Sequence, residues 1–199
     1  SYAKYFKNKK ISIGSQNCYQ KEQFSSNTAA VSPFMLRSVG AKYTLVGHSD
    51  NRGEGDTDST LKDKVKYALK NNLKVVFCIG EDKFEKKKKQ TLSVLKRQLT
   101  KVLEKNFNKN NIIVAYEPIW SIGTGKIPTA SELKKTTIYI KKVLKSIFKK
   151  NSPAVLYGGS VDGSNVEMFK EIGEIDGFLI GGASKSSKKF IDIIKNYYR

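Results

Sequence analysis

Six short apolar runs recur along the chain, and each is bounded by glycine or polar residues. The runs are continuous rather than alternating, which is typical of strands covered on both faces and therefore of a parallel sheet. We predict one strand in each run. The runs are ISIGSQ (11–16), YTLVG (43–47), KVVFCIG (74–80), IIVAY (112–116), AVLYGG (154–159) and GFLIGG (177–182).

Between these runs the apolar residues follow a helical period. Leu61, Val65 and Ala68 are spaced i, i+4 and i+7, and a comparable spacing predicts further helices. These lie within 92–102, 131–150 and 190–194.

Strands that alternate with helices predict an α/β fold with parallel strands. Two architectures remain open from the pattern alone: an open doubly wound sheet, and a (β/α)₈ barrel that lacks some of its units. In both, ligands bind at the carboxyl ends of the strands. We therefore expect the chemistry in the residues that directly follow each strand.

Length and cysteine content narrow the class of protein. A chain of 199 residues is long enough for one domain with a sizeable core. Cys18 and Cys78 are the only cysteines and form no CxxC pair, so we expect neither a disulfide framework nor a structural zinc site. Neither a signal peptide nor a membrane span is predicted. We expect a cytoplasmic protein, and we interpret the start at Ser1, within a stretch typical of a helix end, as a cut.

The net charge of +19 raises the question of nucleic-acid binding. Only four of the 37 basic residues are arginines, although proteins that bind bases and phosphates favour the planar guanidinium group. The lysines are spread over every predicted helix. We therefore interpret them as a solvated surface and expect no nucleic-acid partner.

Polar residues and glycines follow the predicted strands at equivalent positions. Taken singly, a histidine is usually structural, a glutamate is usually a surface charge or a cap, and a glycine pair is usually a turn. Their coincidence at one edge of a sheet indicates a functional site. The residues are Gln16, Asn17, His48, Ser49, Glu81, Glu117, Pro118, Gly158, Gly159, Ser160, Gly181 and Gly182.

Glu117 directly follows the predicted strand 112–116, so its carboxylate is expected at the edge of a buried sheet. Pro118 restricts Glu117 to an extended backbone, and a partly desolvated carboxylate held there has the character of a general base. The segment from Pro118 to Pro128 has stiff ends and a tip loosened by Gly123 and Gly125. We predict a lid that closes over substrate and excludes water.

The glycine pairs 158–159 and 181–182 predict an anion site. Without Cβ atoms, they let backbone N–H groups approach phosphate oxygens, helped by the start of a following helix. Ser160 adds a hydroxyl group. Phosphate held by the loops of the last two strands is a recurrent arrangement in (β/α)₈ barrels.

Five motifs, in this order, resemble those of triosephosphate isomerases, and the resemblance extends from about Lys10 to the C-terminus. AYEPIWSIGTGK is highly specific, whereas the other motifs are weak by themselves. The motifs are GHS (47–49), CIGE (78–81), AYEPIWSIGTGK (115–126), YGGSV (157–161) and GFLIGGAS (177–184).

The resemblance implies a (β/α)₈ barrel, of which this chain carries about six βα units as a single domain over 1–199. It implies an isomerase of glycolysis and gluconeogenesis that interconverts dihydroxyacetone phosphate and glyceraldehyde 3-phosphate through an enediolate, without metal or cofactor. His48 is then the neutral electrophile and Glu117 the base, and a helix starting at Ser49 disfavours the imidazolium, an effect for which this family is itself the usual example. The implied phosphate-binding residues are Gly123, Ser160, Gly181 and Gly182.

The chain also departs from the family pattern. Family barrels run to about 250 residues, and the first predicted strand resembles the family's third, so we expect the first two βα units to be absent. The absent first strand carries an asparagine and a lysine that contact substrate. Asn51 replaces the arginine of the family motif, and Ala30 stands where its acidic partner would be. The altered loop around 19–32 is the implied homodimer contact.

The sequence is compatible with three functions: an isomerase of triose phosphates, a phosphate-binding remnant of that family that has lost catalysis, and a basic nucleic-acid binder. The first is preferred. Because no lysine occupies the position of the family's lysine, we expect residues 1–199 alone to have little activity, and a longer chain with the first two units to be active. Strand edges left open by the gap are expected to make the chain unstable or self-associating.

Overall fold

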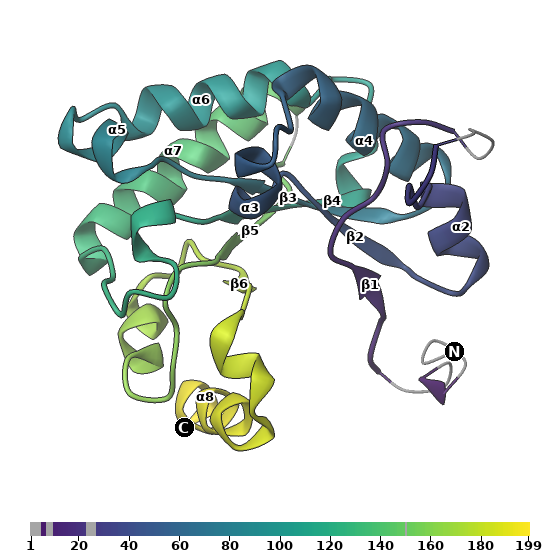
Figure 1. Ribbon diagram of the computed structural model, residues 1–199. Helices are drawn as coiled ribbons and strands as arrows, with labels where there is room; N and C mark the ends of the chain where they lie inside the picture. Colours follow the sequence, from purple (N-terminus) through teal and green to yellow (C-terminus); the bar gives the residue numbers. More distant parts are fainter. Residues whose placement is uncertain (1–4, 7–9, 23–26, 150) are drawn as a thin grey trace.

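The six predicted strands form one parallel sheet in the computed structural model, which describes residues 5–6, 10–22, 27–149 and 151–199. Each strand pairs with the next one along the chain, so the order is β1-β2-β3-β4-β5-β6 without a reversal. This order excludes the doubly wound sheet, and the curled sheet matches the predicted barrel (Figure 1). The strands are β1 (Gly14–Ser15), β2 (Tyr43–Val46), β3 (Lys74–Ile79), β4 (Ile112–Tyr116), β5 (Ala154–Tyr157) and β6 (Gly177–Phe178).

The two outer strands are shorter than predicted. The runs 11–16 and 177–182 contribute only two residues each, as β1 and β6. Both are the outermost strands of the described sheet and pair on one side only, so fewer ladder hydrogen bonds hold them extended. Beyond β6, the N–H of Leu179 still donates to the carbonyl of Tyr157 at 2.9 Å.

All four helices predicted from spacing are present, and each contains or nearly matches its predicted segment. Residue 150, at the end of one prediction, and most of the predicted helix end at 1–10 lie outside the described residues. The helices are α4 (Asp58–Lys70), α6 (Thr91–Val102), α7 (Ala130–Phe148) and α8 (Ser187–Tyr198).

Short helices complete the connections. The helix expected to begin at Ser49 is α3 (Ser49–Gly53), whereas α2 (Pro33–Ser38) and α5 (Lys83–Lys87) were not predicted. Both helices are too short for an apolar period to be detected, but the sequence contains their capping residues. Ser32 precedes a proline, and Asp82 forms a capping box. The 3₁₀ helices are Lys109–Asn111, Ile119–Ser121, Val166–Glu171 and Gly182–Lys185.

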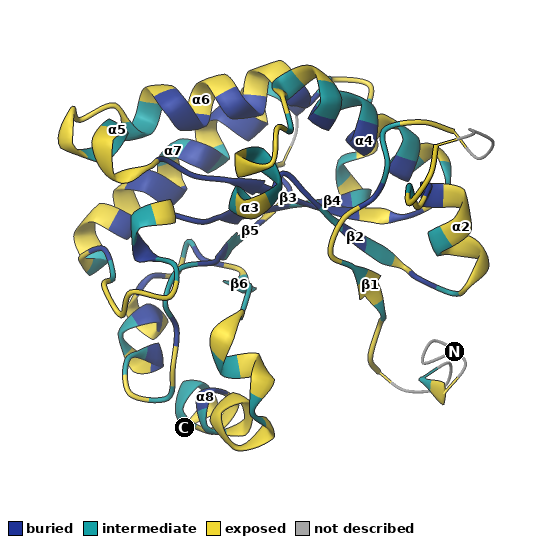
Figure 2. Cartoon of the chain, viewed as in Figure 1, coloured by how far each residue is buried: buried dark blue, intermediate teal, exposed yellow. Residues whose placement is uncertain are grey.

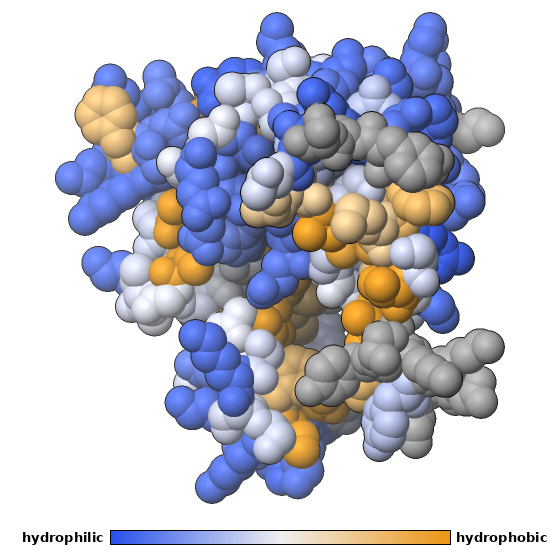
Figure 3. All heavy atoms as spheres, turned by 45° about the vertical axis from the view of Figure 1, so that its right-hand side comes forward, coloured by the Kyte–Doolittle hydropathy of each residue, from blue (hydrophilic) through white to orange (hydrophobic). Residues whose placement is uncertain are grey.

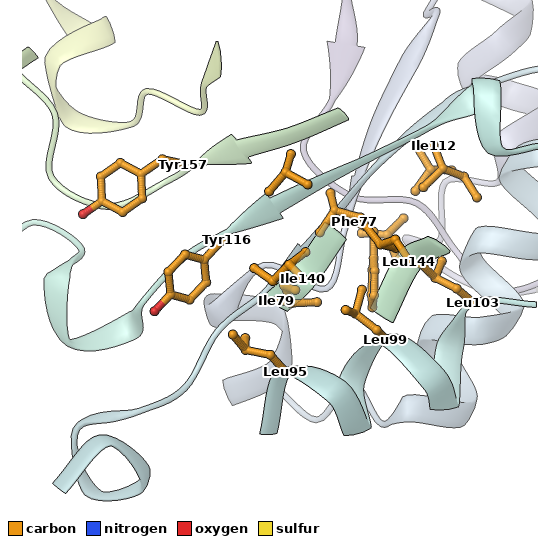
Figure 4. Close-up of a cluster of buried hydrophobic side chains, with 14 of the residues drawn as sticks. Phe77, Ile79, Leu95, Leu99, Leu103, Ile112, Tyr116, Ile140, Leu144 and Tyr157 are labelled. Carbon is orange, nitrogen blue, oxygen red and sulfur yellow. The ribbon is translucent and has the colours of Figure 1, made fainter. Parts of the chain in front are cut away.

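The main core lies between the sheet and its helices (Figure 2). Phe77 lies beside Leu99 and Leu144 of the helices (Figure 4), and the alternate strand residues Ile79 and Tyr157 belong to the same cluster. The intervening residues face the inside of the curled sheet, where a smaller buried cluster contains Val76, Cys78 and Ala115. Apolar residues on both faces explain why the strand runs are continuous.

Apolar surface remains on the face that carries β1. Figure 3 brings this edge forward and shows apolar side chains in a hollow of that face. Val31, two residues before α2, and Met35, within α2, are 46% and 47% exposed. In the described sheet β1 and β6 each pair on one side only, so their outer edges are open, while the effect of these edges on stability stays a prediction. No helix in the described part of the chain is both long and apolar enough to cross a membrane.

Candidate active site

A cavity of about 610 Å³ lies at the carboxyl ends of the strands, the position expected for a ligand in a parallel α/β fold. It brings together almost all the residues that were predicted from the strand ends. Those that line it are Gln16, Asn17, His48, Glu117, Gly123, Gly158, Gly159, Ser160, Gly181 and Gly182. Ser49, Glu81 and Pro118 do not line it, and the side chain of Glu81 has another role.

Glu117 leaves the end of β4 with its backbone N–H donated to the carbonyl of Ile79 at 2.7 Å. The residue is only 3% exposed, and this burial raises the pKa of Glu117 to about 7, while His48 and a hydrogen bond from the Cys78 thiol oppose the rise. A carboxylate loses hydration in such a place, so the proton is held more tightly. A group with a pKa near neutrality can both take up and return a proton at physiological pH.

His48 is the N-cap residue of α3, and its Nδ1 accepts a hydrogen bond from the backbone N–H of Asp50 at 3.3 Å. An accepting Nδ1 carries no proton, so in the neutral ring the proton is on Nε2. That Nε2 atom lies 3.4 Å from Oε1 of Glu117. The placement of His48 at a helix start is confirmed. The hydrogen bond from Asp50 orients the ring so that Nε2 faces Glu117.

Two glycines make room for Glu117. A Cβ atom on Gly80 would lie 1.7 Å from the carbonyl oxygen of Glu117, and one on Gly158 would lie 2.7 Å from its Cγ. The N–H of Gly158 is donated to the carbonyl of Tyr116 at 2.8 Å. The interpretation of Gly158 as a phosphate donor is therefore wrong, because its N–H is used within the sheet and its missing side chain accommodates Glu117.

The other predicted anion-binding glycines differ in how crowded they are. A Cβ on Gly159 would lie 2.1 Å from the hydroxyl of Tyr157, so close packing within the protein also requires this glycine. Around Gly123, Gly181 and Gly182 no atom lies within 4 Å of the added Cβ. These three glycines leave open space beside the cavity that they line.

The predicted lid, residues 118–128, lies against the loop that follows β5. The Ser160 hydroxyl donates to the carbonyl of Ser121 at 2.6 Å and accepts from the N–H of Gly125 at 3.2 Å. The Ser121 hydroxyl is 3.2 Å from that of Tyr157. Gly123 and Gly125 have φ of 67° and 72°, so the tip uses the left-handed backbone that glycine favours. In this arrangement the hydroxyl of Ser160 is engaged by the lid.

Glu81 anchors the first part of the lid instead of lining the cavity. It is fully buried, and its carboxylate accepts hydrogen bonds from Nε1 of Trp120 at 2.8 Å and from the Tyr116 hydroxyl at 3.1 Å. Burial raises the pKa of Glu81, and these hydrogen bonds oppose the rise. The amino group of Lys86 lies 3.8 Å from the centre of the Trp120 ring. The positions of Glu81 and Trp120 in the sequence did not indicate this pairing.

The comparisons with known proteins agree with this geometry. The family model described as "Triosephosphate isomerase" matches residues 1–197. The chain is 40% identical to a triosephosphate isomerase of Saccharomyces cerevisiae over 96% of this chain and 77% of that protein. It is 34% identical to that of Thermodesulfovibrio yellowstonii, over 98% and 80%.

A crystal structure of triosephosphate isomerase from Bartonella henselae has a TM-score of 0.89 and 32% sequence identity, and the alignment covers 99% of this chain and 82% of that chain. This chain belongs to the triosephosphate isomerase family. The interpretation as a nucleic-acid binder is not supported, and neither is that of a remnant without catalysis.

Arg52, which follows Asn51 in the chain, links the ends of two strands. Arg52 donates from Nε to the carbonyl of Gly47 at 2.9 Å and from an Nη atom to that of Cys78 at 3.1 Å. It thereby ties the end of β2 to the end of β3, beneath His48. Burial lowers the pKa of Arg52, and Asp58, 3.6 Å away, opposes this. The family motif alone gave no indication of this role.

Proposed function

We propose that this triosephosphate isomerase family member interconverts dihydroxyacetone phosphate and glyceraldehyde 3-phosphate by proton transfer through an enediolate. The observation that carries the proposal is the buried Glu117 carboxylate, with a pKa of about 7, beside Nε2 of His48 at 3.4 Å. An aldose–ketose isomerisation requires a base with a pKa near neutrality and a hydrogen-bond donor, placed so that both contact the same substrate molecule.

Glu117 removes a proton from the carbon next to the carbonyl group and returns it to the neighbouring carbon. His48 donates a hydrogen bond from Nε2 to the substrate oxygen on which negative charge develops. Because Nδ1 accepts from the N–H of Asp50, the ring is held in the tautomer that can make this donation. Closure of residues 118–128 excludes water from the enediolate and suppresses side reactions.

The phosphate group binds at the opposite part of the cavity, through the backbone of Gly123, Gly181 and Gly182, with Ser160 linking this site to the lid. The support is the open space beside these glycines and their position on the cavity wall. The proposal needs neither a metal nor a cofactor. Among the described residues, no group of three or more His, Cys, Asp and Glu side chains is placed to hold a metal ion.

The function is tested by following deuterium uptake from D₂O into either triose phosphate by NMR, together with a coupled assay of net conversion. We expect the protein to catalyse both exchange and conversion. Isotope exchange detects proton transfer even where net turnover is slow, and inorganic phosphate binding is measured on the same sample. A protein that binds phosphate and catalyses no exchange would contradict the proposal and would match a phosphate-binding remnant.

We further propose a homodimer through the loop around 19–32 and the exposed start of α2. Residues 23–26 of this loop lie outside the described part of the chain. Its base is closed by the N–H of Tyr19 donating to the carbonyl of Val31 at 2.9 Å, and Val31 and Met35 present apolar surface beside it. Burial of such surface favours association.

Light scattering on a sizing column is expected to give the mass of two chains, and Met35→Glu is expected to shift the protein towards the monomer. The matched control is Ile138→Glu, because Ile138 is also 47% exposed but lies on α7. A monomer at every concentration tested would contradict this assembly. We also infer a reducing cytoplasmic location, because both cysteines are unpaired and buried.

A further inference from the structure

One lysine of the run 86–89 lies against the predicted lid. The run consists of the end of α5 and the residues that follow it. Three of its lysines are exposed, whereas Lys86 is partly buried, and its amino group lies 3.8 Å from the centre of the Trp120 ring. A cation this close to the face of an indole is attracted by the electrons of the ring. Lys86 therefore differs from its neighbours, although the sequence shows four equivalent lysines.

Lys86 contacts both ends of the lid, residues 118–128. At the first end its amino group lies over the ring of Trp120, which belongs to the 3₁₀ helix Ile119–Ser121. At the second end the same amino group lies 3.6 Å from Oε1 of Glu132. Glu132 forms a capping box with Thr129, the residue directly after the lid. One ammonium group thus links two points that are separated in sequence by most of the lid.

Lys86 is itself held from outside the lid. Its backbone N–H donates to the carbonyl of Asp82 at 3.0 Å, and the Asp82 side chain caps α5 by accepting from the N–H of Glu85 at 2.7 Å. The Glu85 carboxylate lies 3.8 Å from Arg97, a residue of α6, which packs on the core. Because these contacts fix α5 to the body of the protein, Lys86 can anchor the lid.

The charge of Lys86 also acts on the carboxylates at both ends of the lid. Burial raises the pKa of Glu81, which accepts from Nε1 of Trp120 at 2.8 Å, and Lys86 is among the groups that oppose this rise. The hydrogen bond from the Thr129 N–H lowers the pKa of Glu132, and Lys86 adds to this effect. An ionised Glu81 accepts a stronger hydrogen bond from the indole than a neutral carboxyl group does. Lys86 therefore supports the bond between Glu81 and Trp120 as well as contacting the ring.

We propose that Lys86 is a positioning residue that keeps the lid docked beside the cavity by holding both of its ends. The docked arrangement is the one in the structure, where the N–H of Gly125 donates to the Ser160 hydroxyl at 3.2 Å. The proposal rests on the proposed function, because it concerns the lid that excludes water from the reaction at Glu117. Loss of an exposed cation–π contact corresponds to a change of about two- to fivefold in the ratio of docked to undocked lid.

The test follows the exchange of two lid N–H groups with D₂O by NMR, without substrate. Trp120 is the single tryptophan of the chain, so its indole N–H gives one signal, and the N–H of Gly125 reports the contact of the lid tip with Ser160. Lys86→Met removes the charge and keeps the length of the side chain, and it is expected to speed both exchange reactions about two- to fivefold. Lys86→Arg keeps a cation that stacks on aromatic rings and is expected to retain slow exchange.

Lys87→Met is the matched control, because Lys87 is exposed on the same short helix and its loss changes the net charge equally. It is expected to leave both exchange rates unchanged. The N–H of Val114, a fully buried residue of β4, serves as the reference for global unfolding, and its exchange is expected to be the same in all variants.

A further variant tests the contact at the second end of the lid. Glu132→Gln keeps a side-chain oxygen for the capping box but removes the charge that faces Lys86. It is expected to speed the exchange of both N–H groups about twofold. In the Lys86→Met background the same substitution is expected to have no further effect, because Glu132 acts through Lys86.

Unchanged exchange in Lys86→Met would overturn the proposal, as would an equal acceleration in Lys87→Met or a loss of slow exchange in Lys86→Arg. An acceleration confined to the indole N–H would also overturn it, because Lys86 would then hold only the Trp120 ring. So would a full effect of Glu132→Gln in the Lys86→Met background. Because no substrate is present, a missing isomerase activity would count against the proposed function and leave this test intact.

Discussion

Glu117→Gln is expected to lower the rate of proton transfer between the carbons of the triose phosphate by about 10⁴-fold, the upper end of what a general base contributes. The amide has nearly the same shape as the carboxyl group but cannot accept the proton. Because Glu117 is buried at the end of β4 and no other carboxylate in the described cavity lies as close to Nε2 of His48, no neighbour is placed to replace it. Deuterium uptake from D₂O measures the loss.

Phosphate binding is the control measurement. The phosphate affinity of Glu117→Gln is expected to stay within about twofold of that of the unchanged protein, because the uncharged Gln makes no new contact with the phosphate end of the cavity. Exchange at the rate of the unchanged protein would remove Glu117 from the mechanism. A loss of both exchange and phosphate binding would instead indicate that the substitution had disturbed the cavity, and circular dichroism would show whether the fold is retained.

The same variant also tests the protonation of Glu117 in the folded protein. Its pKa rises from the ordinary 4.5 to about 7 on folding, so between these values the folded state binds the proton more tightly than the unfolded chain. The free energy of unfolding contributed by Glu117 is therefore highest below about pH 4.5 and is lost as pH rises towards 7. Relative to the unchanged protein, Glu117→Gln is expected to gain about 3 kcal/mol of stability between pH 4 and pH 8, as measured by urea unfolding.

The strands and longer helices could be predicted because their apolar residues repeat over several turns or fill a buried strand. The position of Glu117 could be predicted for the same reason, since it ends such a strand. The alternation of side chains along a strand also distinguishes Glu117 from Glu81. Ala115 belongs to the inner cluster, which puts Glu117, two residues later, on the inner face. Ile79 belongs to the core on the helix side, which puts Glu81 there as well.

That distinction required knowledge of which face of each strand is the inside of the curled sheet. Both strands are apolar on both faces, so the sequence alone shows no difference between them. The small side chains of Cys78 and Ala115 on the inner face are the signal that could have been used, since a curled sheet has less room inside than outside.

The roles of the glycine pairs also could not be distinguished from the sequence alone. The pair 158–159 and the pair 181–182 look alike in sequence and were interpreted alike. In the structure the first pair is crowded by protein atoms, and the second borders open space. A glycine is required where another part of the chain approaches closely, and such an approach depends on the pairing of strands distant in sequence.

Gly80→Ala is expected to lower the free energy of unfolding by about 3 kcal/mol or more. An inserted methyl group that meets rigid backbone costs more than one that meets movable side chains. The added Cβ would lie 1.7 Å from the carbonyl oxygen of Glu117 and 2.6 Å from its carbonyl carbon. Neither atom can rotate away, so the ends of β3 and β4 must separate. Because this moves the base, kcat of any folded fraction is expected to fall by about 10²-fold as well.

The control is Gly53→Ala at the end of α3, where an added Cβ meets no atom within 4 Å. This substitution is expected to leave the free energy of unfolding within about 0.5 kcal/mol of the unchanged protein. Urea unfolding of the three proteins at one pH measures both effects. Equal stability of Gly80→Ala and Gly53→Ala would mean that β3 and β4 can separate freely at their carboxyl ends, and the rigid placement of Glu117 beside His48 would then have to come from another part of the molecule.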